Sequence, residues 1–340
     1  MIFPDCTYEQ CLLQGLGPLV FPDRLERGVE PAMRVQMMQV CMQNMQHQAQ
    51  MEHVLRLSWQ ALEQAGVQPV LMKGAGLAQY YPSPDRRQWN DVDIYVGPAQ
   101  YHAACAAMRE AWPEALRFDE EKDYYKHYNL IADGVSVEIH RVTILLNHPR
   151  DIRRYAEMEH EAAKNACQWR MGDMELRVFE PTFNAMYVMM HAWEHFLTAG
   201  ATIRQLYDIG YLIEKEHGRI HTDRLKRNLR ALRLTDVWQL YMYILVQHAG
   251  LDKHIAPLYT DTCAERAERM WKALQGENAP VSQKQAAPQN RWARKIWTMH
   301  QRLGEAKRIQ AYSPAYARHM CASVLLHGAL RLFAKDRKWE

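Results

Sequence analysis

Two aspartates stand two positions apart, Asp91 and Asp93, in the segment DVDIYV (residues 91–96), where polar and apolar side chains alternate. The alternation predicts a half-buried β-strand, so both carboxylates project from one face, about 6.5–7 Å apart. Such a pair can bind two Mg²⁺ ions roughly 3.5–4 Å apart, because Mg²⁺ prefers carboxylate oxygens, water and phosphate. We therefore predict a divalent-metal site here. Without metal, we expect the two charges to repel each other.

A third acid, Glu138, stands between Val137 and Ile139 in another predicted strand. A charge inside an apolar strand normally costs stability. Its two neighbours point to the opposite face, so Glu138 can join the two aspartates across a sheet. An Asp-x-Asp pair alone is more often a solvent-facing pair on an edge strand. The presence of Glu138 favours the interpretation that three carboxylates bind metal. We expect two Mg²⁺ ions, for which Mn²⁺ could substitute.

A phosphate-binding turn is predicted at Gly74. The apolar run at residues 67–72 predicts a strand, and a short helix is expected directly after it. Free amide groups at a helix N-terminus bind phosphate. Lys73 and Arg87 are candidates for further phosphate contacts, and the alternative for each is a solvated surface cation.

Three short segments, LMKGA (71–75), RQWNDVDI (87–94) and VEIH (137–140), resemble the NTP_transf_5 family of uncharacterised nucleotidyltransferases. The family pattern is of the type L-K-G-x, R-x-x-x-D-[IV]-D-[IL] and [VI]-E-[IL]-H, and the resemblance spans about residues 30–250. It implies a DNA polymerase β-type fold, α+β with a mixed sheet, in which Gly74 opens the nucleotide site and the three acids bind metal.

Two expected downstream helices are similar to the family as well. His191 and His195 match a His-x-x-x-His helix, and Arg204 and Asp208 match an Arg-x-x-x-Asp helix. These four residues are candidates for contacting substrate or supporting the site. His140 lies on the same strand face as Glu138 and is a candidate to orient an acid or to contact substrate. The alternative is that it is a histidine packed in the core.

The resemblance implies transfer of a nucleoside monophosphate from an NTP to a hydroxyl-bearing acceptor, which is a small molecule, sugar, peptide or protein. Superfamily members usually place Gly-Ser or Gly-Gly at the phosphate turn. This chain has Gly74-Ala75, so a serine hydroxyl contact to phosphate is missing, and the gap from Gly74 to Asp91 is longer than usual. A catalytically silent nucleotide-binding module of the same fold is therefore the alternative.

A competing motif, H-x-x-E-H, is formed by His191, Glu194 and His195. On a helix the two histidines share a face, as zinc ligands do, and the glutamate can act as a general base. The motif is short, and the helix around it is rich in Met and aromatic residues, which favours core packing. A zinc metalloprotease remains a further alternative.

Hydrophobic periodicity divides the chain into three expected parts. Residues 1–66 form an N-terminal helical segment, residues 67–180 a mixed α+β unit that the resemblance implies is the nucleotidyltransferase core, and residues 181–340 a helical domain with a linker at 276–290. Asp133-Gly134 predicts a tight hairpin turn between two strands. Expected helices cover 31–65 and 99–111, and the helical domain carries the set 182–197, 201–216, 222–232, 235–249, 263–275, 291–310 and 314–335.

The overall balance of charge and cysteine limits the function classes. The 340 residues include 42 basic and 39 acidic side chains, for a net charge of +3, which argues against a general nucleic-acid coat protein. We see neither a signal peptide nor an apolar stretch of about 18 residues, so no membrane span is expected. The seven cysteines are scattered and never spaced C-x-x-C, which predicts reduced thiols and a cytoplasmic location.

Overall fold

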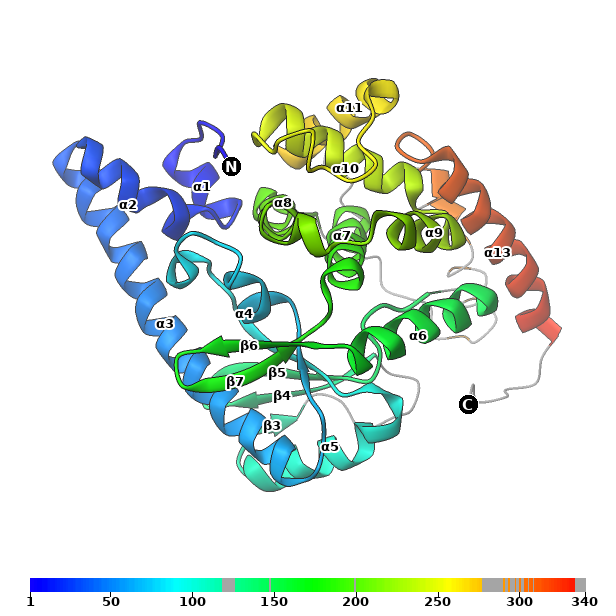
Figure 1. Cartoon of the computed structure of the whole chain (residues 1–340), viewed down its shortest axis with the longest axis horizontal. Helices are drawn as coiled ribbons and strands as arrows, with labels where there is room; N and C mark the ends of the chain where they lie inside the picture. The colour runs from blue at the N-terminus through cyan, green and yellow to red at the C-terminus, as the bar shows by residue number, and fades with distance from the viewer. Residues whose placement is uncertain are drawn as a thin grey trace. The chain divides into compact units, whose positions relative to one another are not determined.

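The computed structural model describes residues 1–117, 126–146, 148–198, 200–276, residue 290, individual residues between 293 and 309, and residues 310–333 (Figure 1). The chain divides into two compact units. We call residues 3–144 with 159–184 the sheet unit, and residues 1–2 and 145–158 with 185–340 the helical unit. The boundaries expected after residues 66 and 180 remain predictions.

The sheet unit is built on a mixed, seven-stranded sheet with the order β3-β4-β5-β2-β1-β7-β6. Its strands are β1 Val70–Leu71, β2 Asp91–Tyr95, β3 Leu116–Arg117, β4 His127–Ala132, β5 Val135–His140, β6 Cys167–Met171 and β7 Met174–Val178. Strand β2 pairs in parallel with β5, and β1 pairs in parallel with β7, whereas the other neighbours are antiparallel. The predicted α+β class with a mixed sheet is confirmed.

The helices of this unit are α1 Tyr8–Leu13, α2 Gly17–Arg27, α3 Pro31–Gln64, α4 Lys73–Ala78, η1 Pro84–Arg86, α5 Gly97–Ala111 and the C-terminal part of α6 Pro149–Lys164. The long helix α3 confirms the prediction for residues 31–65. It starts with Pro31 at its first position, and Gly66 follows its end with a φ of +72°, a conformation that favours glycine.

Residue parity gives the sheet one apolar and one polar face. Val92, Ile94, Val137 and Ile139 are fully buried in a core that also contains side chains of α3 and α5. Burial of each such side chain contributes about 1.5–3 kcal/mol. Since side chains alternate along a strand, the acidic residues between them face the other side of the sheet.

The hairpin between β4 and β5 fixes the register of this polar face. Asp133 and Gly134 have φ values of +46° and +77°, as a two-residue turn with two positive φ angles requires. A second hairpin joins β6 and β7, with Gly172 at a φ of +60° in its turn. Strand β3 and helix α6 were not predicted from the sequence.

The helical unit contains the rest of α6 and most of α7 Pro181–Thr198, followed by α8 Ile203–Glu216, η2 His217–Arg219, α9 Thr222–Leu232, α10 Thr235–His248, η3 Asp261–Cys263, α11 Ala264–Leu274 and α13 Pro314–Phe333. These bounds confirm the predicted helices. The exceptions are the expected linker at 276–290 and the helix at 291–310, which fall largely outside the described residues.

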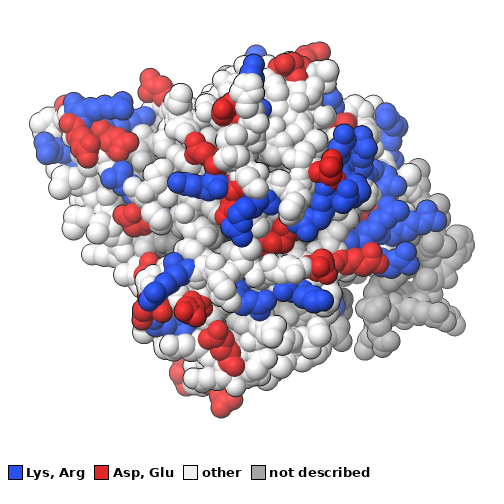
Figure 2. Space-filling model, in the orientation of Figure 1, with Lys and Arg blue, Asp and Glu red and all other residues white. Residues whose placement is uncertain are grey.

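Positive charge is concentrated in this unit. Residues 222–233, which form α9 and the residue after it, carry a net charge of +4, more than the +3 of the whole chain. Figure 2 shows Lys and Arg side chains gathered over α9. The near-neutral total therefore conceals a local basic surface.

Two further expectations concern thiols and membranes. Cys6 and Cys11 form a disulfide, so the prediction of reduced thiols is wrong for this pair. The structure describes five other cysteines, all as free thiols. Across the described residues, no helix has both the length and the apolarity needed to cross a membrane.

Candidate active site

The three predicted acids meet on the polar face of the sheet. In the parallel pairing of β2 with β5, Asp93 stands directly beside Glu138. Asp91 lies two residues earlier on the same face, and each of the three acids offers a carboxylate oxygen within 4.8 Å of the other two. Parity along each strand therefore led to the correct face, and the parallel register brings the two strands' acids together.

Lys73 reaches into this patch from the turn after β1. Its φ of +38° is rare for a residue with a Cβ, and its Nζ lies 2.6 Å from Asp93 Oδ1. Burial would lower the pKa of Lys73, but the carboxylates of Asp93, Asp91 and Glu138 outweigh it and raise the pKa to about 12. The lysine side chain is 12% exposed, so it is a largely buried, charged partner of the acids and not a solvated surface cation.

Gly74 lies where the chain passes close to the start of β2. Helix α4 begins at Lys73, but the backbone at Gly74 is not helical, with φ 9° and ψ −106°. A Cβ at this position would lie 3.2 Å from Trp89 Cβ and 3.3 Å from the Asp91 carbonyl oxygen. A side chain at this position would therefore be crowded by Trp89 and by the backbone of Asp91. The methyl group of Ala75 belongs to the hydrophobic core, so this position adds no polar group to the patch.

Arg87, the second candidate for a phosphate contact, is also buried, with 4% of its surface exposed. Its Nη1 donates a hydrogen bond to the backbone carbonyl of Gln88, and its charge lowers the pKa of Asp91. The surface-cation interpretation is therefore wrong for Arg87 as well. Contact with phosphate stays a prediction for both cations.

His140 is fully buried beside the acids. Its Nε2 lies 2.9 Å from Asp93 Oδ1 and 3.1 Å from Glu138 Oε2, and its Nδ1 lies 3.4 Å from the Val142 carbonyl oxygen. The histidine thus connects the two strands' acids, which agrees with the prediction that it orients a carboxylate.

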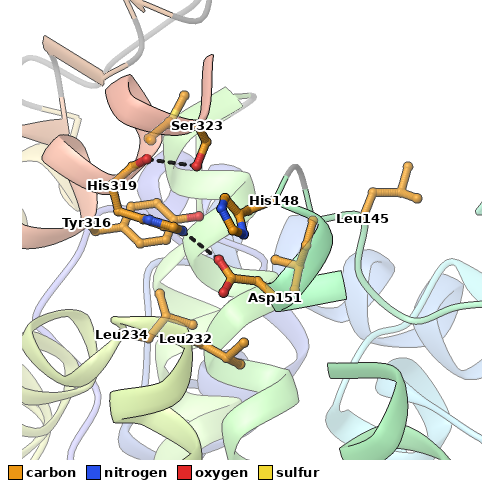
Figure 3. Close-up of a pocket in the computed structure, with 10 residues that line it drawn as sticks. Leu145, His148, Asp151, Leu232, Leu234, Tyr316, His319 and Ser323 are labelled. Carbon is orange, nitrogen blue, oxygen red and sulfur yellow. Dashed lines mark hydrogen bonds and ion pairs between the residues drawn. The ribbon is translucent and has the colours of Figure 1, made fainter. Parts of the chain in front are cut away.

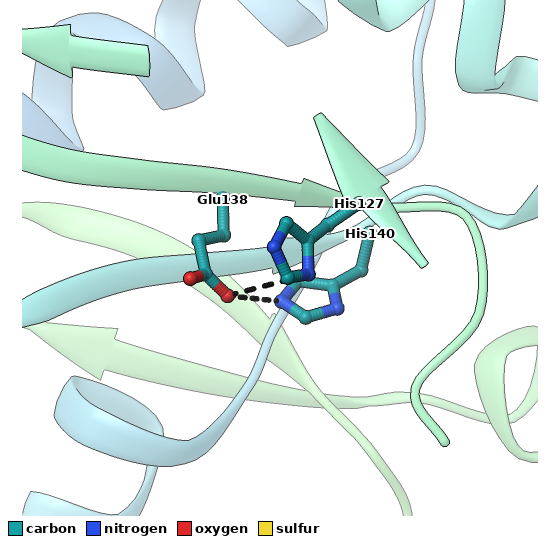
Figure 4. A group of neighbouring side chains, drawn as sticks. All are labelled: His127, Glu138 and His140. Atoms are coloured by element: carbon teal, nitrogen blue, oxygen red, sulfur yellow. Dashed lines mark hydrogen bonds and ion pairs between the residues drawn. The ribbon is translucent and has the colours of Figure 1, made fainter. Parts of the chain in front are cut away.

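His127 is a neighbour that the sequence analysis missed. It stands opposite His140 in the β4–β5 hairpin, with the ring centroids 4.9 Å apart, and its Nδ1 lies 3.6 Å from Glu138 Oε2 (Figure 4). The signal was present, because the two-residue turn at Asp133-Gly134 sets the register that pairs residues 127 and 140.

The electrostatic environment shifts the pKa values of the three acids in different directions. Repulsion from Asp93, followed by burial, raises the pKa of Asp91 to about 6. Burial would raise the pKa of Asp93, but Lys73 and His140 together hold it well below its usual range. Burial would raise the pKa of Glu138, but the hydrogen bond with His140 and the charges of His140 and Lys73 together outweigh it, so the pKa is lowered.

The donor set fits a divalent cation. Asp93 is 1% exposed, and its Oδ2 has no hydrogen-bond partner among the described residues. Buried polar atoms are nearly always satisfied, so an unpaired carboxylate oxygen next to two other acids is a vacant donor for a metal ion. Asp91, Asp93 and Glu138 are the residues that could hold it.

The remaining predicted residues belong to the helical unit. His191 and His195 lie one turn apart on α7 with ring centroids 4.5 Å apart, and Arg204 and Asp208 lie on α8. Their contribution to a substrate site stays a prediction. Within the described residues, the groups of three or more close metal-ligating side chains include neither of these histidines nor Glu194, so the zinc protease gains no support.

A second polar cluster, also missed by the sequence analysis, lines a cavity of about 50 Å³ inside the helical unit (Figure 3). Asp151 is 5% exposed and accepts hydrogen bonds from His319 Nε2 at 2.5 Å and from Arg233 Nη1 at 3.2 Å. The ring of His148 lies 5.1 Å from that of His319. The cavity has room for a few water molecules but not for a nucleotide, and we interpret the cluster as a buried ion-pair network.

Comparison with known proteins gives a matching family and distant structural likenesses. A family model described as an uncharacterised nucleotidyltransferase, NTP_transf_5, matches residues 5–250. The chain is also similar to the crystal structure of an antigenic nucleotidyltransferase-like protein from Paracoccidioides brasiliensis, with 13% identity and a TM-score of 0.37. That likeness covers 60% of this chain and 93% of the other. No curated protein matches.

Proposed function

Because this chain belongs to the NTP_transf_5 family of uncharacterised nucleotidyltransferases, we propose that it is a metal-dependent nucleotidyltransferase. It moves a nucleoside monophosphate from an NTP to a hydroxyl-bearing acceptor, with Mg²⁺ the ion expected for three carboxylates. The observation that carries the proposal is the convergence of Asp91, Asp93 and Glu138, with a buried oxygen of Asp93 left without a partner.

The proposed reaction is an in-line displacement at the α-phosphorus of the NTP. The acceptor oxygen forms a bond to this phosphorus, the bond to the bridging oxygen of the β-phosphate breaks, and pyrophosphate leaves. The acceptor's proton passes to a carboxylate, for which Glu138 is the candidate because its lowered pKa keeps it ionised. Metal bound at the three acids would neutralise the charge of the triphosphate.

The buried cations have a defined task in this scheme. Lys73 neutralises Asp93 in the metal-free protein. A metal ion that takes over this carboxylate would release the ammonium group for the phosphates of the NTP, next to the turn at Gly74. Arg87, whose charge already acts on Asp91, is the second candidate for phosphate.

One observation favours the alternative of a silent nucleotide-binding module. The lysine that pairs with Asp93 supplies a permanent positive charge where a catalytic site would place a metal ion. In a silent module this pair would persist in the presence of metal and nucleotide, and nucleotide would bind without turnover.

The test is pyrophosphate release by the purified chain. Each NTP is supplied with MgCl₂ or MnCl₂ and an acceptor pool extracted from a cell lysate, and the labelled product is isolated. Asp91→Asn and Glu138→Gln should each reduce the rate by about 100-fold or more. Glu175→Gln, an exposed acid on β7 of the same unit, should leave it unchanged. Nucleotide binding without pyrophosphate release under any condition would favour the silent module.

A further inference from the structure

Two imidazole rings lie among the carboxylates of the candidate active site. His140 Nε2 is 2.9 Å from Asp93 Oδ1 and 3.1 Å from Glu138 Oε2, and His127 Nδ1 is 3.6 Å from the same glutamate oxygen (Figure 4). Ligands at about 2.1 Å from one metal ion and at right angles to each other are about 3.0 Å apart. These atoms already have the spacing of ligands that share one ion.

We propose that His140 and His127 are metal ligands, so that this site binds its ion through nitrogen as well as oxygen. The site then selects a first-row transition ion such as Mn²⁺ over Mg²⁺. Imidazole is a good ligand for transition ions, whereas Mg²⁺ favours oxygen and keeps several water molecules. The inference rests on the proposed function only because it concerns the same metal site. It replaces Mg²⁺, the ion that the three acids alone would favour, by a transition ion.

Two unsatisfied atoms favour a metal over a closed hydrogen-bond network. Asp93 Oδ2 and His127 Nδ1 are both buried, and neither has a hydrogen-bond partner in the part of the chain that the structure describes. A network that served only to position the acids would satisfy such atoms, because an unpaired buried donor or acceptor destabilises the folded state. Both atoms lie in the same patch and can each donate a lone pair to an ion.

The surroundings of His140 also suit a ligand. Its Nε2 lies 2.9 Å from Asp93 Oδ1 and 3.1 Å from Glu138 Oε2, so in the absence of metal this nitrogen donates its proton to the acids. A metal ion would take the place of that proton, and the ring would then carry its proton on Nδ1, which faces the Val142 carbonyl oxygen at 3.4 Å. A backbone carbonyl behind the second nitrogen is the usual arrangement for a histidine that binds metal.

The test measures metal binding without nucleotide, so it is independent of turnover. The full chain is stripped with EDTA and titrated with MnCl₂ and with MgCl₂ by calorimetry, and the Mn²⁺ complex is examined by pulsed EPR for coupling to ¹⁴N. We expect nitrogen coupling and a Kd for Mn²⁺ about 10-fold or more below that for Mg²⁺. His140→Asn should weaken Mn²⁺ binding about 10- to 100-fold and Mg²⁺ binding much less.

Matched variants keep the test decisive. His53→Asn removes an exposed histidine of α3 and should change neither affinity. His127 is 27% exposed, so His127→Asn supplies a second ligand variant if loss of the buried His140 prevents folding. The wild-type EPR spectrum needs no variant at all.

The outcomes separate this inference from the proposed function. Mn²⁺ bound without nitrogen coupling would overturn the inference and leave metal-dependent transfer intact. Failure to bind either ion, alone or with an NTP, would overturn both. Nitrogen coupling and preference for Mn²⁺ with no pyrophosphate release would support the inference and count against the transferase.

Discussion

Lys73 Nζ lies 2.6 Å from Asp93 Oδ1, and the aspartate side chain is fully buried. From the sequence alone, repulsion in the absence of metal should affect Asp91 and Asp93 alike. The pair with Lys73 makes the two aspartates different. Asp93 is compensated by a cation, so its pKa is lowered, whereas Asp91 carries the repulsion and its pKa rises to about 6. The two aspartates of one motif therefore have opposite effects on stability.

Asp93→Asn should destabilise the metal-free protein. The substitution leaves the Lys73 ammonium buried without its partner, and breaking a buried pair from one side costs about 3–5 kcal/mol. Urea unfolding of the EDTA-treated protein measures the change. The double variant with Lys73→Met should recover part of the loss, because the ammonium group is then removed together with its closest partner. Equal stability of Asp93→Asn and wild type would show that the pair contributes nothing to the fold.

Asp91→Asn should have the opposite effect, and the effect should depend on pH. A folded pKa of about 6, above the ordinary value of 3.8, means that the native state holds more protons between these two pH values. Stability then falls as pH rises through this window, by roughly 2–3 kcal/mol in total. The asparagine variant should exceed wild type by this amount at pH 8 and lose its advantage below about pH 4. Unfolding curves at several pH values without metal measure it, and a pH-independent difference would show that titration of Asp91 is not its cause.

Gly74→Ala should damage the site through crowding. The added methyl group would lie 3.2 Å from Trp89 Cβ and 3.3 Å from the carbonyl oxygen of Asp91, the residue that opens the acidic strand. We expect a loss of about 1–3 kcal/mol in unfolding free energy and weaker nucleotide binding. Gly218→Ala is the matched control, since a methyl group there meets nothing within 4 Å. Equal effects of the two substitutions would mean that the turn tolerates a side chain.

Metal and nucleotide together should raise the melting temperature of the wild type. A ligand that binds only the folded state adds about 2.7 kcal/mol of stability at 100 times its Kd. Glu138→Gln should abolish most of this increment, because it removes one of the three carboxylates proposed to bind the metal ion. Glu175→Gln should retain the increment. Thermal scans with MnCl₂ and a non-hydrolysable NTP measure the difference. An undiminished shift in Glu138→Gln would remove this residue from the proposed metal site.

The cluster inside the helical unit gives a prediction that is independent of catalysis. Asp151→Asn removes the charge that pairs with His319 and Arg233, and Asp151 is nearly fully buried. We expect a loss of about 3 kcal/mol in unfolding free energy. Glu157→Gln, an exposed acid on the same helix, should change it by less than about 0.5 kcal/mol. A small effect of Asp151→Asn would argue against the ion-pair interpretation of the cluster.

The sequence determined the features that depend on neighbouring residues. Alternation along β2 and β5 placed Asp91, Asp93 and Glu138 on the polar face of their strands, because side chains two residues apart on a strand point the same way. The Asp133-Gly134 turn located the hairpin, because few residues other than glycine, asparagine and aspartate adopt its positive φ angles. These constraints act within a few residues, so they can be recognised without the fold.

Tertiary structure decided the features that depend on burial and on distant partners. Helix α6 was not recognised because two of its inward positions, Asp151 and Glu159, are acids whose partners lie elsewhere in the chain. Periodicity detects a helix when its buried side chains are apolar, and a satisfied buried carboxylate breaks that pattern. The difference between Asp91 and Asp93 arose in the same way. Their spacing places both side chains on the same face of the strand. The turn after β1, however, brings the ammonium group of Lys73 into contact with Asp93. The pKa of a buried carboxyl group depends on such a partner, which the spacing along the strand does not reveal.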